Sequence, residues 1–292
     1  MNSKAGQTGA TRDSSRRRVW RSVALMLLAT GSLFAAAAAS APALAGQTTS
    51  ADPTDATRSL VASGASDASA TPDSSRTPSM PATHTVWTIG RSVRGRPIVA
   101  ETFGTGSRRI LIMGGIHGNE YGIPVAEALL RYVRTHPSIV PSGTELDIIT
   151  CANPDGRARN RRTNAHNVDI NRNFPSRNWN RKKNASGGLP GSRPGSEPET
   201  KALVALLAQQ HYLRIVSLHS AGGILDWDGP GGGTLARRMS KAAHVPVVRL
   251  GAYHGSMGSY VPQVYRIPIF TWELSRRSFN SRIQAGLIAA IR

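Results

Sequence analysis

The sequence predicts an α/β fold with three layers (α/β/α), in which helices cover both faces of a mixed, mostly parallel central sheet. Three short apolar runs are typical of buried strands, at residues 109–113, 146–152 and 213–218, and a fourth follows at 267–274. Helical patterns separate these runs, and strands that alternate with helices indicate a largely parallel sheet. Sites in such sheets form beyond the carboxyl ends of the strands.

Four segments have apolar residues at helical spacing and are expected to form the covering helices. They are residues 123–136, 197–210, 234–244 and 281–291. Ser196 and Glu199 have the spacing of a capping box, and Pro198 stands just inside the start of the second helix.

Two segments precede the predicted domain. Residues 1–45 contain basic residues, then an apolar stretch that ends in Ala43-Leu44-Ala45, so a signal peptide is favoured over an uncleaved anchor. The arginines of "SRRRVW" leave general secretion and twin-arginine export both open. Residues 46–84 are rich in Ser, Thr, Ala and Pro, which predicts a disordered linker, and the folded domain is expected at 85–292. We therefore expect a periplasmic or secreted protein without stable membrane insertion after cleavage.

Positive charge dominates the chain, with 36 Lys and Arg against 17 Asp and Glu. Without residues 1–45, 30 basic residues remain against 16 acidic ones, a net charge of +14. In an exported protein this charge favours anionic envelope polymers, although a merely solvated basic surface fits as well. Nucleic-acid binding is not expected, because no aromatic-plus-glycine recognition motif is present. Cys151 is the only cysteine, so no intramolecular disulfide can form.

The stretch "GGIHGNEYG" places His117 and Glu120 three residues apart, directly after the first predicted strand. Zinc prefers imidazole and carboxylate ligands, and a catalytic zinc takes three of them from the protein. His219, at the end of another predicted strand, is the third candidate. Gly118 would allow the tight turn that both ligands of the first pair need. Taken alone, each of these residues is more often part of a polar loop or a hydrogen-bonded strand end.

Further motifs follow in order: "NPDG" at 153–156, "RRTN" at 161–164, "NVDINRNFP" at 167–175, "PGSEPET" at 194–200, "SLHS" at 217–220 and "TWEL" at 271–274. Together with "GGIHGNE", they resemble the zinc metallocarboxypeptidase family over nearly all of residues 86–292. Within that family the sequence is most similar to the murein peptide amidase branch. The resemblance implies a carboxypeptidase-like fold, one Zn²⁺ per chain and hydrolysis of the γ-D-glutamyl-meso-diaminopimelate bond in peptidoglycan-derived peptides.

The resemblance also implies roles for individual residues. His117, Glu120 and His219 correspond to the zinc ligands, and Asp169 to a carboxylate that orients the first histidine. Glu273 corresponds to the general base, which activates the attacking water and passes its proton to the leaving amine. Its place inside an apolar run argues against a surface salt bridge.

Four more residues correspond to the substrate-binding groups of the family. Arg162 matches the arginine that polarises the scissile carbonyl, and Arg161 is the alternative register. Asn171 and Arg172 match the pair that holds the terminal carboxylate of the substrate, for which the planar fork of arginine is suited. Tyr253 matches a tyrosine that closes over the bound substrate.

Two groups of residues bear on the side-chain specificity of the predicted site. Tyr260 or its neighbours stand at the position that sets side-chain preference in the digestive enzymes of the family. Asp226 and Asp228 follow the strand of His219 and could meet the ammonium of a diaminopimelate side chain. A turn stabilised by Asp and Gly is an equally good interpretation. Residues 176–196 are expected to form a long basic surface loop, which could steer an anionic wall fragment or serve only as a connection.

Other functions compete with the murein peptidase interpretation. A general zinc carboxypeptidase would share every motif, and an aspartoacylase-type acyl-amino-acid amidohydrolase would share the "GGxHGNE" opening. "NPDG", the Asn171 and Arg172 pair and Tyr253 favour the peptidase. A non-catalytic wall-binding protein would be expected to lack a ligand or Glu273, and all of these are present.

Overall fold

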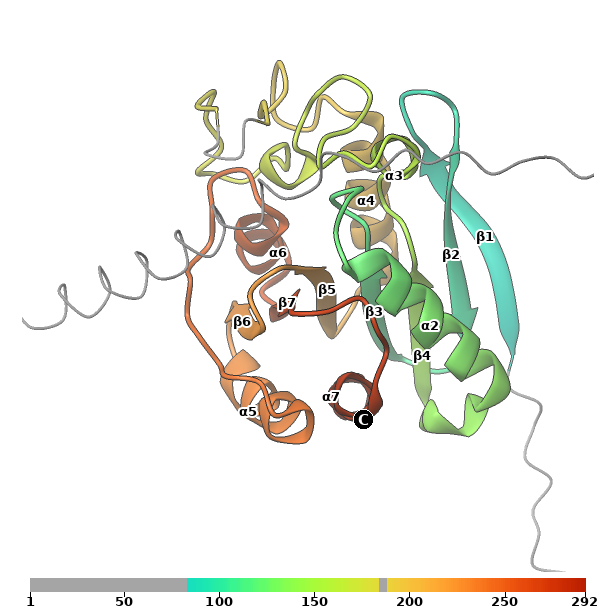
Figure 1. The fold of residues 1–292 in the computed structure, drawn as a ribbon. Helices are drawn as coiled ribbons and strands as arrows, with labels where there is room; N and C mark the ends of the chain where they lie inside the picture. The colour runs from blue at the N-terminus through green and yellow to red at the C-terminus, as the bar shows by residue number, and fades with distance from the viewer. Residues whose placement is uncertain (1–82, 184–187) are drawn as a thin grey trace, which may run out of the picture.

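A computed structural model describes residues 83–183 and 188–292 of the chain. Figure 1 shows these residues as one ribbon coloured along the sequence. The predicted signal peptide and nearly all of the predicted linker lie outside the described residues. The first strand starts at His84, one residue before the predicted start of the domain. No helix in the described ranges has the length and apolar character that crossing a bilayer requires.

A seven-stranded sheet forms the centre of the fold, in the order β1-β2-β4-β3-β5-β7-β6. The neighbours β4, β3, β5 and β7 run parallel, while β1, β2 and β6 pair antiparallel at the two edges. The strands are β1 (His84–Arg91), β2 (Pro97–Phe103), β3 (Arg108–Gly114), β4 (Thr144–Ile149), β5 (Arg214–Ser220), β6 (Ile224–Asp228) and β7 (Ile269–Leu274). The predicted mixed, mostly parallel sheet is therefore confirmed.

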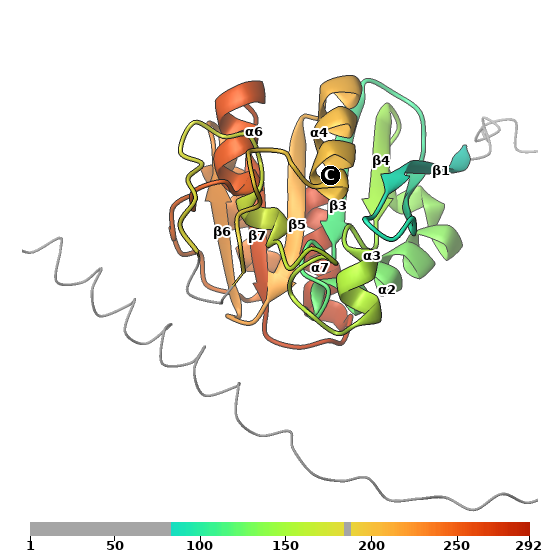
Figure 2. The ribbon, with the colours of Figure 1, turned by 90° about the horizontal axis from the view of Figure 1, so that it is seen from above.

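Helices cover both faces of this sheet, as Figure 2 shows for α4 and α6 on one side and α2 on the other. The longer helices are α2 (Gly122–Thr135), α4 (Pro198–Gln210), α5 (Gly232–Ala243), α6 (Met257–Tyr265) and α7 (Ser281–Ile291). The short ones are α3 (Pro154–Ala158) and the 3₁₀ turns η1 (Pro137–Ile139) and η2 (Ile170–Arg172).

The sequence of strand β3 is a continuous apolar run rather than an alternating one, because both of its faces are buried. Ile110 and Ile112 belong to the core beneath α2, α5 and α7, whereas Leu111 and Met113 belong to the core beneath α4 and α6. All four side chains are fully buried, because successive residues point to opposite faces and both faces are covered. Each such side chain contributes about 1.5–3 kcal/mol by burial.

The predicted capping box is wrong. Helix α4 begins at Pro198, the N-cap residue before it is Glu197 rather than Ser196, and no side chain caps the helix. Ser196 instead donates a hydrogen bond to the Glu197 carboxylate (2.6 Å). The Glu199 carboxylate accepts hydrogen bonds from Val93 N and from the Asn164 side chain. Because these tertiary contacts occupy the carboxylate, it does not bond to the backbone N–H of Ser196 as a capping box requires.

Among the strands and longer helices of the described ranges, β1, β2, β6 and α6 were not predicted, and neither were the short elements α3, η1 and η2. Strand β6 contains Asp226 and Asp228, so the turn expected there begins only at Gly229, which has φ +91°. Helix α6 contains Pro262, and a proline argues against a helix interior in any reading of the sequence. The described part of the predicted loop 176–196 has no helix or named strand, and Figure 1 shows the segment between α3 and α4 above one end of the sheet.

Asp155 fixes the turn between β1 and β2 to helix α3. Its buried carboxylate accepts a hydrogen bond from Arg94 N (2.9 Å) and pairs with the Arg96 guanidinium. Burial alone would raise the pKa of Asp155, but these hydrogen bonds outweigh it and the pKa is lowered below 3.8. The stabilisation is therefore fully present above about pH 4 and is lost as the pH falls through the folded-state pKa.

We expect Asp155→Asn to lower the free energy of unfolding at pH 7 by about 1.5–3 kcal/mol, the range for hydrogen bonds to a charged group. The difference between the variant and the wild type should shrink as the pH is lowered towards 3. Urea unfolding at a series of pH values measures this difference. A difference that is the same at pH 7 and pH 3 would show that the carboxylate charge is not the cause.

Gly118 is required for close approach rather than for an unusual turn. A Cβ at this position would lie 2.1 Å from the carbonyl carbon of Gly156 and 2.2 Å from Arg157 N. The loop after β3 thus presses directly on the backbone of α3, which brings the two segments of the predicted site together.

We expect Gly118→Ala to lower the free energy of unfolding by about 2 kcal/mol or more, because backbone atoms must move to admit the methyl group. Gly233→Ala is the matched control, since its Cβ would meet nothing closer than 3.4 Å. Thermal unfolding of both variants measures the effect, and an equal stability of the two would refute the close-approach explanation.

Candidate metal centre

Three of the predicted residues converge at the carboxyl ends of β3 and β5. His117 and Glu120 lie in the loop between β3 and α2, and His219 is the penultimate residue of β5. The Nδ1 atom of His117 lies 2.7 Å from Glu120 Oε1, and the Nδ1 atom of His219 lies 3.0 Å from Glu120 Oε2. All three side chains are at least nine-tenths buried.

The chemistry of these donors fits a zinc ion. One ligand atom from each residue can be chosen so that all three lie within 4.8 Å of one another. Zinc bonds of about 2.0–2.2 Å to nitrogen and oxygen place neighbouring ligands at such separations. Two imidazoles and one carboxylate are also the preferred ligand types, so the prediction that these three residues could hold one metal ion is supported.

The outer nitrogen of each histidine has its own partner. Nε2 of His117 lies 3.0 Å from Oδ1 of Asp169, the residue expected to orient it, and Nε2 of His219 lies 3.0 Å from Ser217 Oγ. A carboxylate at Asp169 accepts from Nε2, so a neutral His117 in this tautomer would turn the lone pair of Nδ1 towards Glu120, as metal binding requires. Ser217 was not predicted, although its position two residues before His219 on the same face of the strand could have indicated it.

The buried carboxylates stay ionised despite their burial. Burial alone would raise the pKa of Glu120, but the charges of His117 and His219 and their hydrogen bonds hold it well below its usual range. Burial likewise opposes the ionisation of Asp169, and the charges of His117 and Arg162 outweigh it. Two buried anions beside two imidazoles make this region a cation site.

Glu273 lies directly beside the cluster. Strand β7 pairs with β5 so that Glu273 is opposite His219, and the two side chains point to the same face of the sheet. Burial raises the pKa of Glu273 to about 7, a shift that the charge of His219 opposes and that of Glu120 reinforces. A carboxylate whose pKa lies near neutrality is suited to accept and return a proton.

Arg162 joins the cluster, and Arg161 is exposed. The Nε atom of Arg162 donates to Asp169 Oδ2 (3.0 Å), and Nη1 donates to Glu120 Oε1 (3.1 Å). Its guanidinium has five N–H donors in all, so further donors remain for a substrate oxygen. Asn153 holds this loop in place, because its side chain caps α3 and also donates to the carbonyl of Arg162 (3.2 Å).

The predicted carboxylate-binding pair lies beside Tyr253. The Arg172 guanidinium stands over the Tyr253 ring, 4.5 Å from its centroid, and Tyr253 is 42% exposed. Asn171 accepts a hydrogen bond from Met257 N (2.9 Å) through its side-chain oxygen, which leaves its amide NH₂ group to donate. Tyr260, in contrast, is buried in the core beside Phe174, and its hydroxyl lies 3.5 Å from that of Tyr265.

Comparison with known proteins identifies the family. The sequence profile of the zinc carboxypeptidase family matches residues 76–229. Murein peptide amidase A of Escherichia coli (strain K12) is 34% identical over 185 residues, which cover 59% of this chain and 74% of that protein. The chain belongs to the zinc carboxypeptidase family. It is therefore a hydrolase.

Further relatives agree with this family. Murein peptide amidase A of Vibrio campbellii is 30% identical and covers 71% of this chain and 86% of its own length. The crystal structure of murein-tripeptide amidase MpaA from Escherichia coli O157 matches with a TM-score of 0.55 at 27% identity, covering 70% of this chain and 89% of that one. Carboxypeptidase A from Helicoverpa armigera, at 20% identity and a TM-score of 0.60, shares the fold.

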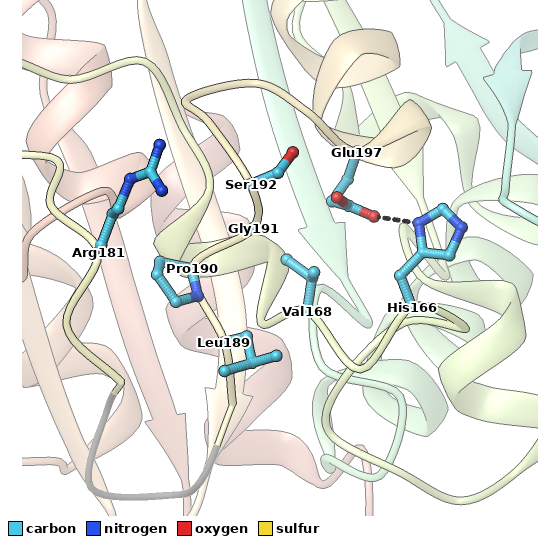
Figure 3. A pocket seen from close by; sticks show the side chains of 8 residues that line it. All are labelled: His166, Val168, Arg181, Leu189, Pro190, Gly191, Ser192 and Glu197. Carbon is cyan, nitrogen blue, oxygen red and sulfur yellow. Dashed lines mark hydrogen bonds and ion pairs between the residues drawn. The ribbon is translucent and has the colours of Figure 1, made fainter.

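A separate hollow of about 480 Å³ lies beside the long loop and contains none of the predicted site residues. Figure 3 shows His166 and Glu197 at one end, joined by a hydrogen bond of 2.8 Å, and Arg181 on the other side. Leu189 and Val168 line it between them. Val168 directly precedes Asp169, so the wall of this hollow continues into the segment that supports His117.

We expect Asp169→Ala to weaken zinc affinity by about 10–100-fold, the usual cost of removing a partner of a metal-binding histidine. Asp169→Asn keeps an acceptor for His117 and should lose less. Competition with a chromophoric chelator measures both affinities, with Glu145→Gln as a control that also removes one carboxylate, at the far end of β4. An Asp169→Ala variant that binds zinc like the control would show that Asp169 does not orient His117.

Proposed function

We propose that this chain is an exported zinc peptidase that cleaves the bond between γ-D-glutamate and meso-diaminopimelate in murein peptides. The hydrolytic part rests on one observation, the place of Glu273 directly opposite His219 beside three converging metal-type ligands. The murein substrate is supported by two relatives named as murein peptide amidases, aligned over 74% and 86% of their lengths. Export is supported by the signal-peptide pattern of residues 1–45.

The name of a further relative points to the same class of bond. Gamma-D-glutamyl-L-diamino acid endopeptidase 1 of Lysinibacillus sphaericus is 23% identical over 236 residues, which cover 64% of this chain and 59% of that protein. A γ-D-glutamyl linkage to a diamino acid is the bond that the proposal assigns to this chain.

Different residues of the chain have different roles in the proposed hydrolysis. A zinc ion held by His117, Glu120 and His219 would polarise the scissile carbonyl and acidify water. Glu273 accepts the proton of the attacking water and returns it to the leaving amine. Arg162 donates hydrogen bonds to the negative charge that develops on the carbonyl oxygen.

Separate residues bind the terminal carboxylate of the substrate. Arg172 and the side-chain amide of Asn171 bind the carboxylate of the leaving residue, and Tyr253 covers it. These contacts fix the scissile bond relative to Glu273, and such positioning accounts for a large share of many enzymatic rate enhancements.

We expect Glu273→Gln to reduce kcat by about 10²–10⁴-fold, the contribution typical of a general base, while zinc content stays at one ion per chain. The measurement uses zinc-loaded protein and L-alanyl-γ-D-glutamyl-meso-diaminopimelate, with release of free diaminopimelate followed by mass spectrometry. A chelated wild-type sample is the second control and should be inactive.

Each other result would contradict a different part of the proposal. Release of C-terminal L-amino acids from ordinary peptides, without cleavage of the murein peptide, would make the chain a general carboxypeptidase. Cleavage of acylated amino acids alone would favour the amidohydrolase. Full activity of Glu273→Gln would remove Glu273 from the reaction.

A further inference from the structure

Two aspartates lie on the face of the sheet that carries Glu273. In the pairing of β6 with β7, Asp226 is opposite Thr271 and Asp228 is opposite Ile269. Thr271 and Ile269 are two and four residues before Glu273 on the same strand. Because alternate residues of a strand share a face, and opposite residues of paired strands do so as well, both aspartates point to the side of Glu273 and His219.

Asp226 is only partly satisfied by its neighbours. Its Oδ1 atom accepts hydrogen bonds from Trp227 N (2.8 Å) and Leu250 N (3.2 Å), and the side chain is almost completely buried. Arg249 Nε lies 3.9 Å from Oδ1, at the outer limit of an ion pair. The guanidinium of Arg249 is instead placed over the Trp227 ring, 4.2 Å from its centroid, and its side chain is 52% exposed.

Asp228 is 9% exposed, and its side chain makes no hydrogen bond or ion pair with any other residue of the described ranges. Its carboxylate faces the first turn of α6, because a Cβ on Gly258 would lie 2.6 Å from Asp228 Oδ2. The oxygens of this carboxylate are not among the fully water-excluded unpaired atoms of the described ranges, so they keep some contact with solvent. A cation that replaced this water would compensate the charge of the partly desolvated carboxylate.

The pKa values agree with the burial of both carboxylates. Burial raises the pKa of Asp228 to about 6, and the neighbouring charge of Asp226 adds to this shift. Burial also raises the pKa of Asp226, against its two backbone hydrogen bonds and Arg249. The two carboxylates have one guanidinium near them, that of Arg249 at 3.9 Å from Asp226, so their two negative charges are not balanced by an equal number of positive ones.

The same two aspartates adjoin the groups proposed to bind substrate. Besides burial and nearer charges, the charge of Asp226 raises the pKa of both Glu273 and Tyr253, so Asp226 lies within electrostatic reach of each. Helix α6, which Asp228 faces, begins at Met257, and Met257 N is held by Asn171. Thr271 and Glu273, which border the pair, are only partly buried, so the aspartates are next to solvent-accessible surface.

We propose that Asp226 and Asp228 bind the side-chain ammonium of the leaving residue and thereby make this site selective for a diamino acid. The assignment rests on the proposed function, because it takes the leaving residue to be the one whose carboxylate Asn171 and Arg172 hold. An ammonium between the two carboxylates would supply the missing positive charge, and charge-assisted hydrogen bonds of this kind are about twice as strong as neutral ones.

The experiment compares two peptides that differ only by this ammonium, L-alanyl-γ-D-glutamyl-L-lysine and L-alanyl-γ-D-glutamyl-L-norleucine. The zinc-loaded wild type should cleave the lysine peptide with a kcat/KM at least about tenfold higher. Asp226→Asn and Asp228→Asn should bring the ratio of the two kcat/KM values towards one, while Asp228→Glu should keep a preference for lysine. Glu145→Gln, which removes a carboxylate at the opposite end of the sheet, should leave the ratio at its wild-type value.

A parallel pair of α-linked substrates, hippuryl-L-lysine and hippuryl-L-norleucine, separates this assignment from the proposed function. Equal kcat/KM values for the two γ-linked peptides in the wild type would overturn the role of the aspartates and leave the murein function standing. The meso-diaminopimelate peptide is included as a reference. Cleavage of the α-linked pair, with neither the γ-linked pair nor the reference cleaved, would overturn the murein function, and a lysine preference that depends on Asp226 and Asp228 would still support the assignment. Cleavage of neither the four peptides nor the reference would overturn both.

Discussion

A buried carboxylate between two imidazole nitrogens is the interaction on which the rest of this site depends. Glu120 faces Nδ1 of His117 and Nδ1 of His219 at hydrogen-bond distance, and all three side chains are removed from water. A neutral His117 that donates its Nε2 proton to Asp169 would turn the lone pair of Nδ1 towards the Glu120 carboxylate, 2.7 Å away. Lone pairs at that distance repel unless a proton or a metal ion lies between them, and the two-histidine, one-carboxylate set suits zinc.

The parallel centre of the sheet places this cluster. Strands β3 and β5 are neighbours, so the loop that carries His117 and Glu120 opens beside the end of β5 that carries His219. Strand β7 pairs with β5 on its other side and brings Glu273 opposite His219. The close contact of Gly118 with α3 then draws in the loop of Arg162, whose guanidinium joins Glu120 and Asp169.

The strand register also relates the chemical step to substrate choice. Thr271 and Ile269 precede Glu273 on the same face of β7. Their partners on the neighbouring strand β6 are Asp226 and Asp228, respectively. A leaving residue with a carboxylate and a side-chain ammonium would meet charges of both signs here. Its carboxylate would lie at Arg172, and its ammonium would lie at the two aspartates. Such complementarity discriminates between substrates more than it adds raw affinity.

The sequence predicted the buried parallel strands and the helices next to them, because continuous apolar runs and helical periodicity are strong local signals. It also predicted the residues of the metal cluster, since each follows or ends such a strand. It missed β1, β2, β6 and α6. Helix α6 contains Pro262, a residue that disfavours a helix interior in sequence patterns. Strand β6 is a short edge strand, and its two aspartates are residues typical of turns. The capping box at Ser196 failed because Glu199 is held by Val93 and Asn164 from distant segments, and no local pattern encodes such contacts.

An anomalous difference map at the zinc absorption edge, from crystals of the zinc-loaded protein, tests the metal site directly. We expect one strong peak per chain, coordinated by Nδ1 of His117, the Glu120 carboxylate and Nδ1 of His219, with Glu273 facing it. A map with no peak among these three residues, or with its principal peak at another pair such as His166 and Glu197, would show that they do not form the metal site.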